Sequence, residues 1–161
     1  MTRAANPFNS PLETGIRALT ILVAVYPKLL DLQRLVDFDY LVVHSGDAGG
    51  PESLHVPLPL RPGELLVRRE LIERGLRLMM SRGLIRRAVA ADGIQYQASE
   101  TASPFLKGLT SNYIEKLKER AAWLDHNFGN ATDSEIRKTI TQFFKEWTTQ
   151  FQPREGKPGS R

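Results

Sequence analysis

The fold class of this chain can be predicted from residues 64–98, which read ELLVRRELIERGLRLMMSRGLIRRAVAADGIQYQA. Apolar residues recur at helical spacing through the first half, and Gly83 follows at a position where helices commonly end. Residues 84–90 and 94–98 have the length and composition of strands, and Asp92-Gly93 between them is a dipeptide typical of tight hairpins. The stretch therefore predicts one helix followed by a two-stranded hairpin.

Two further helices are expected before this stretch. Ser10 and Glu13 form the pattern of a helix start, and apolar residues follow at helical spacing until Pro27 ends the segment. A second helix is expected from Asp31, although its last residues, Tyr40-Leu41-Val42-Val43, are compatible with either a helix or a strand. The predicted order is thus helix, helix, loop, helix and hairpin, which is the order of a winged helix.

The C-terminal third predicts two more helices. One covers about 110–128, and the next begins with the capping box formed by Thr132 and Glu135.

In the central helix, which is the one predicted before Gly83, Gly75 costs up to about 1 kcal/mol relative to alanine. This cost predicts that another helix passes close to Gly75.

These elements predict a mainly α fold with a small β-hairpin (α+β), in which a winged-helix-like domain is followed by a C-terminal helical hairpin. The proposed divisions are an irregular segment 1–9, the winged-helix-like domain 10–105 with a long loop 44–63, the helical hairpin 106–151 and a disordered tail 152–161. The loop contains four glycines and four prolines, and a structureless loop of that length is often functional.

Composition excludes several classes of protein. The 161 residues suffice for one domain with a core of its own, and the absence of cysteine excludes disulfides, thiolate metal sites and cysteine nucleophiles. The N-terminal residues lack the apolar region of a signal peptide, and the longest apolar run, Leu19–Tyr26, is too short to cross a bilayer. We therefore expect a cytoplasmic protein without membrane contact.

The sequence displays no pattern of catalytic or metal-binding residues. The three histidines lack the spacing of metal ligands, and Asp37 and Asp39 are interpreted as solvated carboxylates on a helix surface. Gly46–Gly50 is rich in glycine but is not followed by the Lys-Ser/Thr pair of a phosphate-binding loop. We therefore expect no enzyme, no metal and no cofactor.

The basic residues are concentrated in 61–90, which contains eight arginines and three glutamates. In a winged helix this region meets DNA, and arginine can bind phosphates or guanine. The candidates for DNA or phosphate contact are Arg74, Arg77, Arg82, Arg86 and Arg87. Two alternatives remain open: the helical arginines can pair with Glu70 and Glu73 along the helix, or Arg68 and Arg69 can contact an acidic protein partner.

The last predicted helix carries an aromatic stripe that includes Phe143 and Trp147. Such a stripe usually belongs to the core, but any part of it that stays exposed would anchor a protein interface. Phe143 and Trp147 are therefore candidates for partner contact.

Four segments resemble a bacterial protein family: NPFNSPLE at 6–13, FDYLVVHS at 38–45, PESLH at 51–55 and GELLVRRELIERGL at 63–76. The chain is similar over about 6–150 to the small middle component of ABC-three-component systems, which include the Lamassu-type anti-phage systems. The resemblance implies a non-enzymatic subunit with a winged-helix-like domain, placed beside an SMC-like ABC ATPase and a separate effector that is often a nuclease. The interface candidates that it implies are Arg68, Arg69 and Glu70 in the central helix, and His44 and His55 in the loop.

Our first hypothesis is therefore an adaptor in a hetero-oligomeric defence complex, bridging the ATPase and the effector. The alternative is a free-standing winged-helix regulator that binds DNA, whose affinity would fall steeply with salt.

Overall fold

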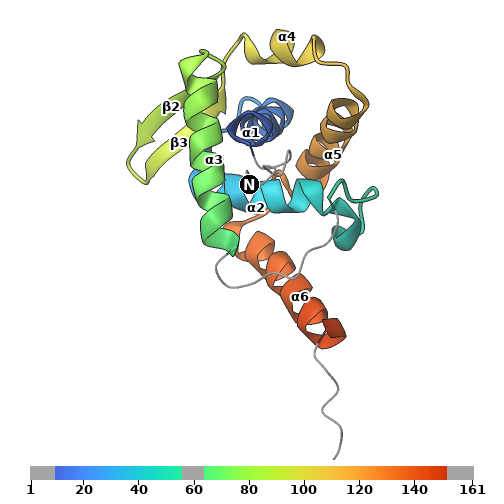
Figure 1. The fold of residues 1–161 in the computed structure, drawn as a ribbon. Helices are drawn as coiled ribbons and strands as arrows, with labels where there is room; N and C mark the ends of the chain where they lie inside the picture. Colours follow the sequence, from blue (N-terminus) through green and yellow to red (C-terminus); the bar gives the residue numbers. More distant parts are fainter. Residues whose placement is uncertain (1–9, 56–63, 152–161) are drawn as a thin grey trace, which may run out of the picture.

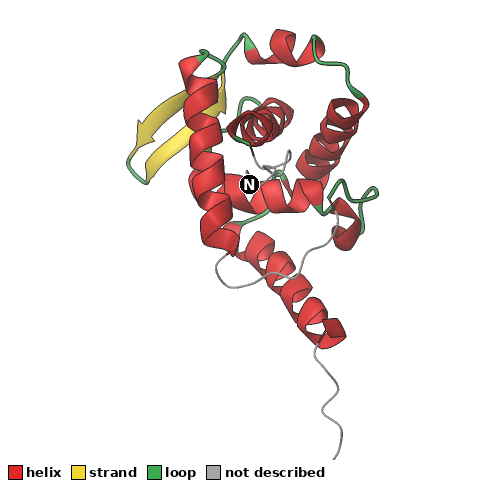
Figure 2. Cartoon of the chain, viewed as in Figure 1, coloured by secondary structure: helices red, strands yellow, loops and turns green. Residues whose placement is uncertain are grey.

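The computed structural model describes residues 10–55 and 64–151, so the expectations for 1–9, for 152–161 and for the second half of the loop 44–63 lie outside the described residues. Helices dominate the chain, and one small antiparallel sheet lies at one side (Figures 1 and 2). The mainly α fold with a small β component is confirmed. The elements in order are α1 (Pro11–Val25), β1 (Leu30–Asp31), α2 (Leu32–Val43), the 3-10 helix η2 (Ser45–Ala48), α3 (Glu64–Ser81), β2 (Ile85–Ala90), β3 (Gly93–Ala98), α4 (Ala102–Lys107), α5 (Asn112–Phe128) and α6 (Asp133–Phe151).

The first two helices begin within one residue of the predicted starts, Ser10 and Asp31. The hydroxyl of Ser10 accepts a hydrogen bond from the N–H of Glu13, and the carboxylate of Asp31 accepts one from the N–H of Arg34. Each side chain thereby satisfies a backbone donor that the first turn leaves free. The alternative left open for 40–43 is settled in favour of a helix, because α2 continues through Val43.

The sheet contains one strand more than the hairpin. The short β1 pairs with β3, so that the strand order is β1-β3-β2 and every pair is antiparallel. Ala91 and Asp92 form the turn of the hairpin. Gly93 follows with φ +121°, a backbone conformation that residues with a Cβ rarely adopt. The Asp-Gly dipeptide therefore marks the turn as predicted, whereas a two-residue strand carries too little pattern to be predicted.

Helices α1 and α3 cross at a contact between two glycines. A Cβ added to Gly75 would lie 2.6 Å from the backbone nitrogen of Gly15, and a Cβ added to Gly15 would lie 2.9 Å from the carbonyl oxygen of Gly75. Both distances are shorter than the contact distance between a carbon atom and a non-bonded backbone atom. The close helix approach predicted at Gly75 is therefore confirmed, and its partner is α1.

The C-terminal helices join the same core as the elements before them. Helix α5 packs against α1 and α2, whereas α6 packs against α2 (Figure 1). A single cluster of buried side chains includes Leu117 and Leu124 of α5 and Ile136 of α6. The residues on both sides of the boundary proposed between 105 and 106 therefore share one hydrophobic cluster, and the division of the chain there stays a prediction.

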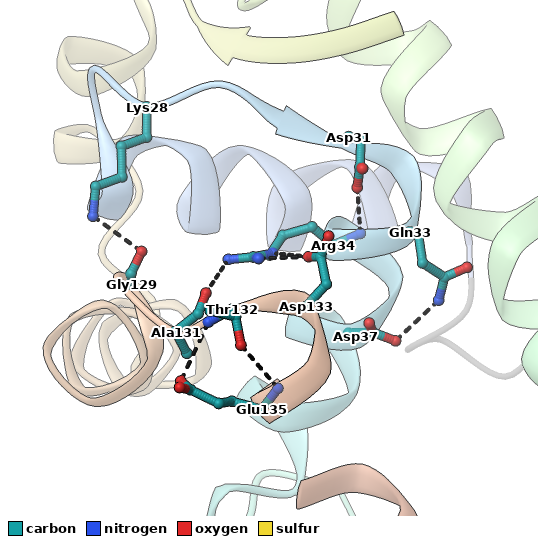
Figure 3. Close-up of polar contacts among 10 residues, drawn as sticks. All are labelled: Lys28, Asp31, Gln33, Arg34, Asp37, Gly129, Ala131, Thr132, Asp133 and Glu135. Atoms are coloured by element: carbon teal, nitrogen blue, oxygen red, sulfur yellow. Dashed lines mark hydrogen bonds and ion pairs between the residues drawn. The ribbon is translucent and has the colours of Figure 1, made fainter. Parts of the chain in front are cut away.

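Polar contacts fix the start of α6 on the start of α2 (Figure 3). The guanidinium of Arg34 donates to the carboxylate of Asp133 and to the carbonyl oxygen of Ala131. Thr132 and Glu135 exchange hydrogen bonds of 3.2 and 3.3 Å between side chain and backbone, which confirms the predicted capping box.

Over the described residues, no helix has the length and apolar character needed to cross a membrane.

Candidate functional site

A buried ion cluster joins α1, α2 and α3. The carboxylate of Asp39 accepts hydrogen bonds from Arg17, at 2.8 Å from Nε, and from Arg68, at 2.5 Å from Nη1. The side chains of Asp39 and Arg17 are only 2% and 3% exposed, whereas that of Arg68 is 21% exposed. The interpretation of Asp39 as a solvated surface carboxylate is therefore wrong, because α1 and α3 cover the helix face on which it lies.

The cluster keeps its charges in the folded protein. Burial alone would raise the pKa of Asp39, but the two guanidiniums outweigh it and hold that pKa below its ordinary value. Burial likewise disfavours the charged form of Arg17, and the neighbouring carboxylate of Asp39 leaves the pKa of Arg17 raised. Three helices are thus tied together by groups that are charged at neutral pH.

Aromatic and imidazole rings surround this cluster. The Arg68 guanidinium lies 5.6 Å from the ring centroid of Tyr40, and the ring of His44 lies 4.8 Å from that of Tyr40. His55 Nε2 is 3.0 Å from the hydroxyl of Tyr113, which brings α5 into the cluster. The structure therefore brings together three of the predicted interface residues, Arg68, His44 and His55, although they come from different parts of the sequence.

Both histidines are neutral at physiological pH. Burial, followed by the nearby positive charge of Arg68, lowers the pKa of His44 to about 4. Burial, followed by the charge of Arg17, lowers the pKa of His55 to about 4. Among the residues that the structure describes, no group of three or more His, Cys, Asp or Glu side chains could hold a metal ion.

The first half of the predicted loop is held on the fold by hydrogen bonds. Residues 45–48 form η2, and the N–H groups of Leu54 and His55 donate to the carbonyl oxygen of Val43. The Arg120 guanidinium donates to the carbonyl oxygen of Glu52 at 2.8 Å. The expectation of a structureless loop is therefore wrong for 44–55, because backbone and side-chain partners on α2 and α5 order it.

The arginines proposed for phosphate contact lie on the surface. Arg74 and Arg77 are exposed on α3, Arg82 follows that helix, and Arg86 and Arg87 are exposed on β2. Successive side chains of a strand point to opposite faces, so Arg86 and Arg87 do not join one continuous surface. Their binding role stays a prediction.

Ion pairs along α3 involve only some of the exposed arginines. Glu73 lies 4.0 Å from both Arg69 and Arg77, whereas Arg74, Arg82, Arg86 and Arg87 form no ion pair with another described residue. Arg69 and Glu70 are exposed on the same helix and are accessible to a partner.

Three other candidates for partner contact are less accessible. His44 is 7% exposed and Phe143 is 8% exposed, because both pack into the core. The prediction that they contact a partner directly does not fit this burial. His55, in the loop itself, is half-buried, and the side chain of Trp147 lies outside the described residues.

Arg17, Asp39 and Tyr113 complete the cluster and were not predicted from the sequence. A signal for one of them exists: Arg17 is the only charged residue between Glu13 and Lys28. A lone charge inside an apolar helical segment requires a partner when that helix is buried, but it does not identify which carboxylate supplies the partner.

Comparison with known proteins gives one family. No curated protein and no solved structure matches the chain. The model of the family described as ABC-three component (ABC-3C) system Middle Component 2 matches residues 7–150, which include the ion cluster, the ordered loop and all the described helices and strands up to the end of α6. The chain therefore belongs to the Middle Component 2 family of ABC-three component systems.

Proposed function

We propose that this chain is a non-enzymatic adaptor subunit of a bacterial defence complex of the Lamassu type, where it bridges an SMC-like ABC ATPase and an effector such as a nuclease. The observation that carries the proposal is the family match over 7–150. A middle component of a three-component system has two other components to contact. In this chain the family match covers almost the whole fold.

The internal geometry supports a role in which the chain offers fixed surfaces. Asp39 is engaged by two arginines, and His55 is engaged by Tyr113. These buried polar groups hold helices and the loop together, so they stabilise the arrangement of the surface around them. Arg69 and Glu70 project from α3 one and two residues after Arg68 of the cluster, and they are therefore presented at a fixed position.

The first experiment is reconstitution from purified components. We expect the ATPase and the effector to co-elute in size-exclusion chromatography when this chain is present, and to elute separately when it is left out. Separate elution of all three proteins at micromolar concentration would refute the adaptor. Nuclease or ATPase turnover by the chain alone would contradict its non-enzymatic role.

A charge swap tests the α3 surface within the same assay. The double variant Arg69→Glu/Glu70→Arg keeps the net charge and reverses the local pattern, so we expect it to weaken co-elution. The matched control is Lys116→Glu/Glu119→Lys, a swap of two exposed residues on α5, which is expected to elute as the wild type does. Equal behaviour of the two swaps would remove Arg69 and Glu70 from the interface.

A second candidate function is a DNA-binding winged-helix regulator. It is favoured by the order α1, β1, α2, α3, β2, β3, by the strand order β1-β3-β2, and by the exposed arginines of α3 and β2. Phosphate contacts would make the logarithm of the affinity fall linearly with the logarithm of the salt concentration. Fluorescence anisotropy with a short labelled duplex tests this: the absence of binding at low salt would exclude the regulator and leave the adaptor in place.

A further inference from the structure

The hairpin presents an unpaired strand edge. Within the described residues 10–55 and 64–151, the order β1-β3-β2 gives the strand β2 a neighbour on one side only. One hydrogen bond determines which backbone groups of β2 face β3. The N–H of Ser99, just after β3, donates to the carbonyl oxygen of Leu84, just before β2, at 2.9 Å. Hydrogen-bonded and non-hydrogen-bonded pairs alternate in an antiparallel ladder. The N–H and C=O groups of Arg86, Ala88 and Ala90 therefore face β3, and those of Arg87 and Val89 face outward.

An apolar pair lies at the far end of the same hairpin. Val89 is 81% exposed and Ile94, directly opposite it on β3, is 45% exposed. They share one face of the hairpin with the half-buried Tyr96, with Arg87 directly opposite Tyr96, and farther along with Ile85, which is in the core. On β3 the apolar residues of this face run from Ala98 in the core through Tyr96 to Ile94, and the hairpin that carries them is seen at one side of the fold in Figure 1.

One arginine charges each face of β2. Arg86 and Arg87 are exposed on the two faces of β2, and neither forms an ion pair with another described residue. Charged residues on an edge strand prevent pairing with a second copy, because like charges would meet. The same residues favour an acidic strand, since opposite charges on neighbouring strands attract.

We propose that the outer edge of β2 binds an extended segment of another protein component, which carries both acidic and apolar residues, as an additional strand of the sheet. This inference rests on the proposed adaptor function. The partner's backbone would pair with the outward groups of Arg87 and Val89. On one face its apolar side chains would cover Val89 and Ile94 and a carboxylate would lie near Arg87, whereas on the other face a carboxylate would lie near Arg86. DNA phosphates would match the arginines, but they would leave the apolar pair exposed and the strand edge unpaired.

The test uses the full chain with the purified ATPase and effector of its own system. Charge reversal by Arg86→Glu/Arg87→Glu is expected to weaken binding of one component by at least about tenfold, measured by biolayer interferometry. Arg74→Glu/Arg77→Glu on α3 is the matched control, because it makes the same change of net charge away from the hairpin, and we expect it to bind as the wild type does.

A second variant and a second measurement test the strand pairing itself. Val89→Ser keeps the backbone and removes the apolar side chain, so we expect weaker binding with an unchanged circular dichroism spectrum. Hydrogen exchange resolved to single residues is expected to show slower exchange at the N–H of Arg87 and Val89 in the complex, whereas the N–H of Ala88 is already paired with β3 in the free chain.

The outcomes distinguish this inference from the proposed function. If the wild-type chain forms the complex but both hairpin variants bind as well as it does, the strand-addition site is refuted and the adaptor stands. If the wild-type chain binds neither component, both fail. If the hairpin variants lose affinity for a labelled DNA duplex and keep their affinity for the proteins, the hairpin binds nucleic acid and the inference is wrong.

Discussion

Replacement of Asp39 by asparagine tests whether the ion cluster holds the helices together. The substitution keeps the shape of the side chain and removes its charge. Arg17, whose side chain is 3% exposed, would then keep a buried guanidinium without a counter-charge. Removing one partner of a buried ion pair costs about 3–5 kcal/mol. Because Arg68 is 21% exposed and can turn toward solvent, we expect the loss to come mainly from Arg17.

The assay is equilibrium unfolding in urea at neutral pH, followed by circular dichroism. A loss of about 3–5 kcal/mol would remove a large share of a typical domain stability of about 5–15 kcal/mol, so the unfolding midpoint should fall strongly. If Asp39→Asn does not fold, Arg68→Met provides the measurement. It leaves the Arg17–Asp39 pair intact and is expected to cost about 1–2 kcal/mol.

The matched control is Asp37→Asn, which makes the same chemical change on the same helix. Asp37 is half-buried and accepts a hydrogen bond from Gln33, and burial raises the pKa of Asp37 above its ordinary value. Removing that charge is expected to change the stability by less than about 0.5 kcal/mol. Equal unfolding midpoints for Asp39→Asn and Asp37→Asn would refute the structural role of the cluster.

Three further predictions concern pH, packing and the placement of α6. Because the pKa values of His44 and His55 fall from 6.5 to about 4 on folding, the unfolded chain binds more protons between these values. The free energy of unfolding should therefore be constant above pH 6.5 and fall as the pH drops toward 4, by up to about 2.7 kcal/mol per pH unit for two histidines; a flat profile in urea titrations would contradict this. Gly75→Ala should destabilise the fold by about 1–3 kcal/mol despite the better helix propensity of alanine, whereas Gly108→Ala, where the nearest atom is 3.4 Å away, should be nearly neutral in thermal unfolding. Arg34→Met should cost about 1–2 kcal/mol and speed up hydrogen exchange in α6, and unchanged exchange there would show that Arg34 does not hold this helix.

Helix starts and the hairpin turn were predictable from the sequence, because they depend on residues that are close together in the chain. The cap Ser10 and the capping box at Thr132 act within one helical turn of the residues that they cap, so their pattern is visible in the chain itself. The start of α2 was placed at Asp31 from the apolar spacing, and the structure added that Asp31 caps it. The hairpin was equally accessible, because Asp92-Gly93 determines a turn of only two residues. At Gly75 the sequence indicated a close helix contact, and the structure added which helix makes it.

The candidate site was only partly predictable, because its contacts join distant positions. Asp39 lies 22 positions from Arg17 and 29 from Arg68, and nothing local distinguishes it from Asp37, which remains half-buried. The same limit applies to α5 and α6. Their apolar stripes predicted buried faces but not which helices would cover them, and the structure shows that α1 and α2 cover α5 and that α2 covers α6.

The two surfaces assigned to partners lie on different elements, one on α3 and the other on the hairpin. Arg69 and Glu70 follow the cluster near the start of α3, and the hairpin begins soon after its last residue, Ser81. The ion cluster fixes one end of α3 and the glycine contact with α1 fixes its middle. Partners bound to the two surfaces would contact different residues. Reversing Arg69 and Glu70 should then affect one component and reversing Arg86 and Arg87 the other, and loss of the same component from both variants would show that the two surfaces form a single site.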